Sequence, residues 1–168
     1  MITVENLFTS HEYHRTPGFA DWDPLKDREA LEDAQLLDAR MCPTASRAAL
    51  LFDMRLATNC PAGNSGLLIV HGMQSFRWVG APPPHELMAF SATSIQLVAG
   101  NGEFRLNMEF FLYGELAIDG ERSDFYLLES HNVSGGPPNY LDRHLDQVRG
   151  ELPWWDSECT VLHSSTSG

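Results

Sequence analysis

The feature that most constrains the fold is a long alternation of apolar and polar residues between Glu103 and Asp119. Its even positions are apolar or glycine, while its odd positions are largely polar. The even positions are Phe104, Leu106, Met108, Phe110, Leu112, Gly114, Leu116 and Ile118. Because successive side chains of a strand point to opposite faces, this pattern predicts β-structure with one buried face and one solvent-facing face.

A single strand of that length would be unusual, so the alternation also predicts a reversal of the chain. Two positions compete for it, Tyr113-Gly114 and Asp119-Gly120, and a turn at the first would make Gly120 a bulge. Upstream, Asn101-Gly102 is the commonest two-residue hairpin signal and joins the alternation to a strand over residues 90–98. Downstream, pairing resumes at residues 125–128. Neighbours in sequence should therefore be neighbours in the sheet.

The remaining segments predict a further hairpin, another strand and two helices. Residues 35–41 and 48–56 form the hairpin, and a strand over residues 67–78 ends before three consecutive prolines. A short helix is predicted over residues 23–31, because Asp23-Pro24 is a good helix start. A C-terminal helix is predicted by apolar residues at helical spacing, namely Leu141, Leu145, Val148 and Leu152.

We therefore predict a single α+β domain that is mainly antiparallel β-sheet. A meander of about six strands forms an open barrel or a two-layer sheet, with a short N-terminal helix and a C-terminal helix. The domain covers residues 1–168, with a loose arm over residues 1–22, a folded body over 23–158 and a frayed tail over 159–168. The predicted core includes Leu50, Phe52, Leu68, Val70, Phe104, Leu106, Met108 and Phe110.

The formal net charge is −12, and it is unevenly distributed. Residues 41–100 hold only two acids and three bases, so the excess of acids lies on either side of them. An acidic surface repels phosphate backbones, which argues against nucleic acid and favours a basic protein as partner. The competing interpretation is that the acids serve only solubility.

The composition also bears on location. The apolar runs are too short to cross a bilayer, so we expect no membrane role. Three cysteines without paired spacing, and no leader sequence after Met1, indicate a reduced, cytoplasmic protein. The oligomeric state is left open.

No motif in the sequence fixes a reaction. His11 and His14 are three residues apart, whereas a zinc-protease helix needs four, so we predict no metal site. Ser65 lies among glycines but precedes a strand, which is not the context of a nucleophile elbow. His71 lies within a strand, either as a core histidine bonded to the backbone or as the general base of an uncharacterised enzyme. We expect a binding protein without cofactor or catalytic residues, and the enzyme using His71 stays an alternative.

The best candidate for a functional site is a mixed acidic and aromatic face. Glu103, Glu109 and Glu115 share the outer face of the alternation with Phe111 and Tyr113. Aromatic anchors supply affinity and carboxylates steer a basic partner, so these five residues form the predicted binding set. In the alternative, the terminal helix or the tryptophans near the C-terminal end cover the aromatic rings.

Binding of a small apolar ligand is the second candidate function. A curved sheet with an open mouth can hold such a molecule. Trp78, His71 and Tyr126 would then line the site. The same residues could equally fill a solid core.

The order of these signals resembles small bacterial all-β proteins of unknown function, some of which are grouped with immunity proteins of polymorphic-toxin systems. The resemblance covers about residues 31–129. Its stretches are Leu31-Glu32-Asp33-Ala34-Gln35-Leu36, Leu67-Leu68-Ile69-Val70-His71-Gly72-Met73-Gln74-Ser75-Phe76 and Phe125-Tyr126. Leu152-Pro153-Trp154-Trp155-Asp156-Ser157 is similar to the tail of uncharacterised actinobacterial proteins. The resemblance implies a single β domain that neutralises a cognate toxin by contact, and it implies no catalytic residue.

Overall fold

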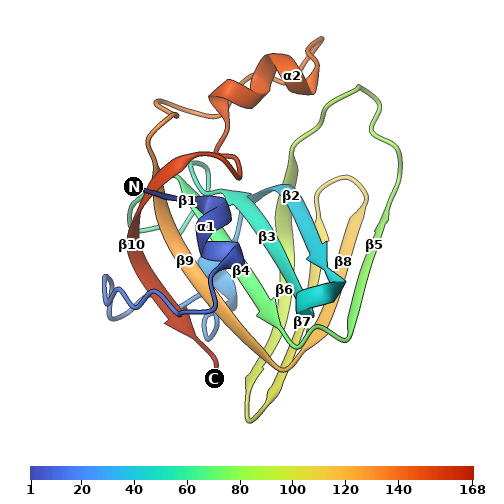
Figure 1. Cartoon of the computed structure of the whole chain (residues 1–168). Coiled ribbons are helices and arrows are strands. Elements are labelled where there is room, and N and C mark those ends of the chain that lie inside the picture. The colour runs from blue at the N-terminus through green and yellow to red at the C-terminus, as the bar shows by residue number, and fades with distance from the viewer.

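The computed structural model describes residues 1–168 and consists mainly of antiparallel β-sheet. Ten strands lie in the order β1-β10-β9-β4-β3-β2-β6-β7-β8-β5 (Figure 1). Their bounds are β1 Ile2–Thr3, β2 Gln35–Cys42, β3 Arg47–Asp53, β4 Ser65–His71, β5 Ser75–Gly80, β6 Phe90–Gly100, β7 Glu103–Phe110, β8 Gly114–Gly120, β9 Arg122–Ser130 and β10 Glu158–Thr166. The antiparallel class is confirmed, but the expected meander of about six strands is wrong.

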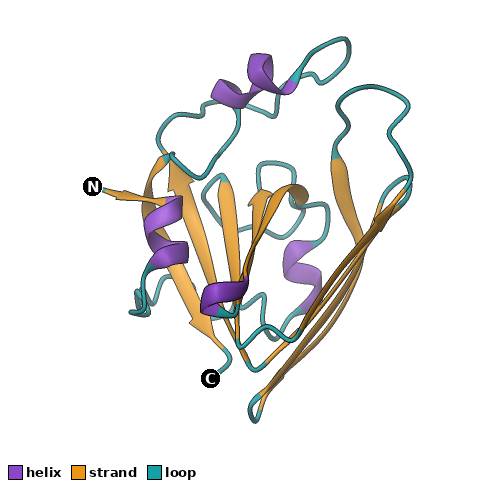
Figure 2. Cartoon of the chain, turned by 45° about the vertical axis from the view of Figure 1, so that its right-hand side comes forward, coloured by secondary structure: helices purple, strands orange, loops and turns teal.

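The long strand β6 divides the sheet into two layers. At its start β6 pairs with β2 through Phe90 and Ser91, and along the rest of its length it pairs with β7. The first layer holds β1, β10, β9, β4, β3 and β2, and the second layer holds β6, β7, β8 and β5. Figure 2 shows the two layers facing each other at an angle, with one helical turn between them.

The core lies between the two layers. The eight predicted core residues are each at most 5% exposed, so this prediction is confirmed. Residues 22–34 enter the space between the layers and bury Trp22, Leu25 and Leu31 against the same cluster. Burial of this apolar surface is the main term that holds the layers together.

The helices differ most from the predictions. Helix α1 spans Val4–Thr9, inside the segment predicted to be a loose arm. Thr3 and Asn6 form a capping box at its start, and Val4, Leu7 and Phe8 are buried along one side. The arm is therefore attached to the sheet through an apolar helix face.

The other predicted helices are shorter than expected. The helix over residues 23–31 is reduced to a 3₁₀-helix, η1 (Arg28–Leu31), and Asp23 instead accepts a hydrogen bond from the amide of Leu25 at 3.0 Å. The C-terminal helix is reduced to α2 (Leu145–Val148) and the 3₁₀-helix η3 (Arg149–Glu151). A third 3₁₀-helix, η2 (Pro43–Ala45), joins β2 to β3. No helix has the length and apolar composition needed to cross a membrane.

The chain turns at both positions that competed in the sequence. The first turn is residues 111–113, between β7 and β8, and the second is at Glu121, between β8 and β9. Gly120 is the last residue of β8, so the predicted bulge there is wrong. A Cβ at Gly120 would lie 2.5 Å from Cγ1 of Val70, so the close approach of β8 to the first layer requires glycine.

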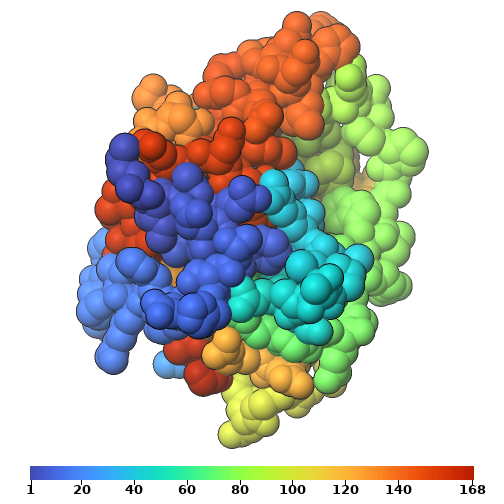
Figure 3. Space-filling model, viewed as in Figure 1, coloured from blue at the N-terminus to red at the C-terminus, as the bar shows by residue number.

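Segments from both ends of the sequence cover the outer face of the first layer. Strand β10 forms where a frayed tail was predicted, and it pairs with both β9 and β1. Nδ1 of His163 accepts hydrogen bonds from the amides of Gly18 and Phe19 at 3.2 and 3.0 Å. These bonds fasten the N-terminal segment to β10. Figure 3 shows the N-terminal segment lying across this face beside the C-terminal segment.

Candidate functional site

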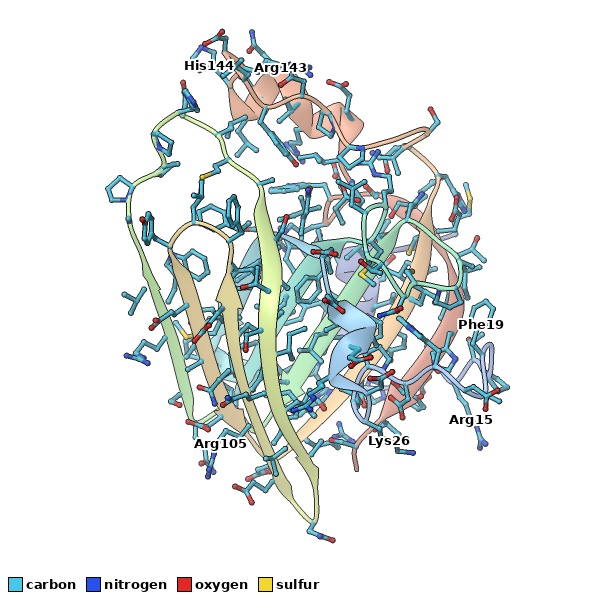
Figure 4. All side chains as sticks on the ribbon, turned by 180° about the vertical axis from the view of Figure 1, so that it is seen from behind. Arg15, Phe19, Lys26, Arg105, Arg143 and His144 are labelled. Atoms are coloured by element: carbon cyan, nitrogen blue, oxygen red, sulfur yellow. The ribbon has the colours of Figure 1, made fainter.

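The outer face of the second layer is uncovered, in contrast to that of the first. Every second residue of β7, from Glu103 to Glu109, is exposed, and β5 is exposed along nearly its whole length. Figure 4 shows these strands in front, with no chain segment crossing them. A bare four-stranded face of this kind is available to a partner.

Two glutamates oppose each other on this face. Glu109 on β7 and Glu115 on β8 are register partners, and Val79 and Ser94 extend the same row onto β5 and β6. Neither glutamate takes part in an ion pair. Like charges directly opposite each other destabilise a sheet. A cation placed between the two carboxylates would relieve that repulsion.

Three large apolar residues form the turn next to these glutamates. Phe111, Leu112 and Tyr113 are 61%, 41% and 73% exposed. The alternative that the terminal helix or the C-terminal tryptophans cover these rings is therefore wrong. Leu112 also has a φ of +79°, a conformation that is strained for a leucine. We call Glu109, Phe111, Leu112, Tyr113 and Glu115 the β7–β8 corner.

The β7–β8 corner continues onto the edge strand β5 through Val79, which is 49% exposed, whereas Trp78 lies on the inner face of the layer, opposite Leu116. Trp78 packs against Phe90 and Phe110, with ring centroids 5.4 and 5.8 Å away, and still exposes 41% of its surface. A hollow of about 350 Å³ lies on the outer face between Val79, Tyr113 and the two glutamates. The corner thus combines exposed rings, a shallow depression and unpaired negative charge.

Glu103 does not belong to this group. It lies at the far end of β7, where it pairs with Arg105 at 2.8 Å, and Arg105 also reaches Asp119 at 3.3 Å. Figure 4 shows Arg105 near the end of the layer opposite to α2. Of the five predicted binding residues, the structure therefore brings together four.

The residues of the apolar-ligand alternative are not brought together. Trp78 lies on the edge strand of the second layer. Tyr126 belongs instead to the cluster on the outer face of the first layer, where burial raises its pKa to about 12. His71 lies on that face at the end of β4, so these three residues do not line one site.

His71 bonds to a carboxylate and not, as expected of a core histidine, to the backbone. Its Nε2 and Oδ2 of Asp124 are 2.7 Å apart, and both side chains are largely buried. Burial is the largest single influence on the pKa of Asp124 and would raise it. Hydrogen bonds to His71 and Thr166, together with the charges of His71 and Arg122, outweigh burial, and the pKa is lowered. Oδ1 of Asp124 is buried without a hydrogen-bond partner. This pair could orient an imidazole for proton transfer, which is the feature that the enzyme alternative needs.

Sequence reasoning missed several residues of these surfaces. Val79 and Leu112 join the β7–β8 corner only through register and turn geometry, which alternation does not specify. Arg55 was also missed: it forms a bidentate, buried ion pair with Asp53, with N–O distances of 2.9 and 2.7 Å. An acid and an arginine two residues apart at the end of an apolar strand were the available signal.

Comparisons with known proteins give no functional name. No family model matches the chain, and no curated protein is similar to it. A solved structure, an uncharacterized protein from Neisseria gonorrhoeae, is similar with a TM-score of 0.42 and 14% sequence identity, over 56% of this chain and 90% of the other.

Proposed function

We propose that this protein is a non-enzymatic binding protein whose β7–β8 corner engages a basic protein, in the manner of an immunity protein that neutralises a toxin by contact. The observation that supports the proposal most strongly is the unpaired opposition of Glu109 and Glu115 beside exposed aromatic rings. A lysine or arginine of the partner fits between these carboxylates, and the adjacent rings offer both apolar contact and cation–π attraction.

The overall charge supports the same function. A net charge of −12 attracts a basic partner over long distances and accelerates encounter, whereas buried aromatic contacts slow dissociation. The glutamates of the corner should therefore affect the association rate constant, and its aromatic rings the dissociation rate constant. The immunity assignment rests on the sequence resemblance, and a gene for a large secreted toxin beside this one would support it.

The test uses the wild-type chain and three variants as baits in the source organism. Glu109→Lys and Phe111→Ala change the corner, while Glu158→Lys makes the same charge change at an exposed position of β10, in the other layer. A basic protein captured by the wild type and by Glu158→Lys, but reduced with both corner variants, supports the proposal. Equal capture by all four baits, or capture of no basic protein, contradicts it.

Kinetics with the captured protein then separate the two roles. Glu109→Lys should slow association, with an effect that shrinks as salt is added, because exposed charges are screened within about 10 Å at 0.1 M salt. Phe111→Ala should leave association nearly unchanged and speed up dissociation. Equal effects of both variants on both rate constants would contradict this division.

An enzyme that uses His71 is the second candidate, and the His71–Asp124 hydrogen bond is the observation in its favour. His71→Gln tests it against Glu109→Lys in a toxin-protection assay in cells. If protection survives Glu109→Lys but is lost in a folded His71→Gln variant, the enzyme alternative gains and the contact mechanism loses.

A further inference from the structure

One side of β6 is an open sheet edge. Across this edge, Ala92 exchanges hydrogen bonds with the chain itself: its amide donates to the carbonyl of Ala34 at 2.9 Å, and its carbonyl accepts from the amide of Asp33 at 3.0 Å. Beyond Ala92 the neighbouring segment turns away into η1, and β2 pairs with β6 only at residues 90 and 91. The pairing that starts at Ala92 is thus left incomplete.

The register shows which main-chain groups face this edge. Gly100 and Glu103 flank the two-residue turn at the end of β6 and form a hydrogen-bonded pair with each other. Because such pairs alternate, the amides and carbonyls of Ile95, Leu97 and Ala99 point away from β7 and toward the open edge. No hydrogen bond outside the sheet ladders involves these groups. Three donors and three acceptors therefore remain free at the regular spacing of a strand.

The open edge is also one wall of a trough. The opposite wall is residues 24–29, and two hollows of about 400 and 270 Å³ follow β6 between the walls. The hollows share Arg28, Glu29, Ile95 and Gln96, so they form one continuous depression along the strand. Figure 4 shows the η1 segment running beside β6 on this side.

We infer that this trough binds an extended peptide segment of another protein, which adds to β6 as a further strand. Main-chain groups in strand register recognise an extended backbone, and pockets for alternate side chains select the sequence. Peptide side chains that lie beside Ile95 and Leu97 would face the apolar core, since Ile95 is buried and Leu97 packs on the core. Side chains beside Gln96 and Val98 would face the bare outer surface. The segment should therefore alternate apolar residues with polar ones, and the net charge of −12 favours basic ones.

The geometry favours a single segment over a second copy of this chain. The wall at residues 24–29 stands beside the edge, and a second sheet would have to enter the trough past it. Two copies would also bring together charges of −12 each. This surface lies on the opposite edge of the second layer from β5, so the inference is independent of the β7–β8 corner.

The test is amide hydrogen exchange with a defined probe, an end-capped hexapeptide of alternating valine and lysine, and a control peptide with proline replacing the central valine. With saturating probe, exchange at the amides of Ile95, Leu97 and Ala99 should slow about tenfold, because these donors become bonded. The amides of Gln96 and Val98, already bonded to β7, should change little. The control peptide should have no effect.

A variant strengthens the test. Leu97→Pro removes one edge-facing donor without removing a bond to β7, which is the kind of strand position that tolerates proline. In a folded Leu97→Pro protein the probe should no longer slow exchange at the remaining edge amides. The measurement on the wild type stands by itself if the variant does not fold.

Three outcomes would overturn the inference. One is unchanged exchange at the β6 edge with saturating probe. Another is slowing at Phe76, Trp78 and Gly80, whose register places their amides on the free edge of β5. The third is slowing at the β6 edge without probe that grows with protein concentration, which would identify a second copy as the occupant.

Discussion

Replacing Arg55 by alanine should destabilise this protein far more than replacing a surface arginine. The guanidinium of Arg55 donates two hydrogen bonds to the carboxylate of Asp53, and further bonds to the carbonyls of Gly136 and Glu151 at 2.9 and 3.0 Å. The Asp53 side chain is fully buried and that of Arg55 is 7% exposed. Arg55 thus joins the end of β3 to two distant loop segments while neutralising a buried charge.

The size of the effect follows from that burial. Removing one partner of a buried ion pair costs about 3–5 kcal/mol, because the remaining charge is left without compensation. In a chain of this length each kcal/mol lowers the melting temperature by about 2–4 °C, so we expect a decrease of roughly 6–20 °C. Urea unfolding followed by tryptophan fluorescence measures the free energy directly.

Arg105→Ala is the matched control. Its ion pairs with Glu103 and Asp119 lie on the bare face, and its side chain is 57% exposed. An exposed pair contributes about 0–1 kcal/mol, so this variant should unfold close to the wild type. If Arg55→Ala and Arg105→Ala cost the same, the argument from burial is refuted. An Asp53→Leu, Arg55→Met double variant should recover much of the loss, since no unpaired charge remains.

Three further predictions concern strain and pH. Leu112→Asn should raise the unfolding free energy by up to about 1 kcal/mol in urea, because asparagine tolerates the positive φ at this turn, and a loss of stability would contradict the strain. Burial lowers the pKa of His163 below its ordinary 6.5, so the unfolded chain takes up the proton first; stability should be complete above pH 6.5 and fall as the pH drops below it. His163→Gln should flatten this pH dependence of the free energy of unfolding. An unchanged pH profile would show that protonation of His163, and the loss of its bond to the amide of Phe19, does not cause the dependence. The pKa of Asp124 is lowered from 3.8, so its contribution is present above that pH and lost as the pH falls through the lower folded value; acid titration of His71→Gln should show a smaller loss than the wild type.

The part of the fold that the sequence predicts well is the part where alternation and burial agree. Phe104, Leu106 and Met108 lie on one face of β7 and are buried, because the residues between them are polar and the face that carries them is exposed to solvent. Helix α1 also carries a local signal, the capping box of Thr3 and Asn6, although the segment was predicted to be a loose arm. These elements are set by residues close together in the sequence.

The elements that were missed depend on distant partners. Strand β10 is rich in serine and threonine and resembles a frayed tail, yet Ser164 and Ser165 are buried. Ser164 bonds to the N-terminal segment, because its Oγ accepts a hydrogen bond from the amide of Thr16 at 2.6 Å. Buried serine and threonine residues of this kind leave no periodic pattern of apolar residues in the sequence, so the strand could not be predicted from it. The β7–β8 corner was partly predicted, because alternation identified Glu109 and Glu115, but only the register showed that they face each other.

The pairing of β1 with β10 has a consequence for synthesis on the ribosome. Ile2 and Thr3 find their partners at Cys159 and Glu158, near the other end of the chain. Translation adds about 5–20 residues per second, so the first residues wait many seconds for β10 to be made. Until then α1 and the edge of β9 stay uncovered, and contacts that span most of the sequence form slowly. During its synthesis, a nascent chain of this topology therefore exposes the apolar face of its first layer to water. The same face is also open to any protein that binds an incomplete sheet.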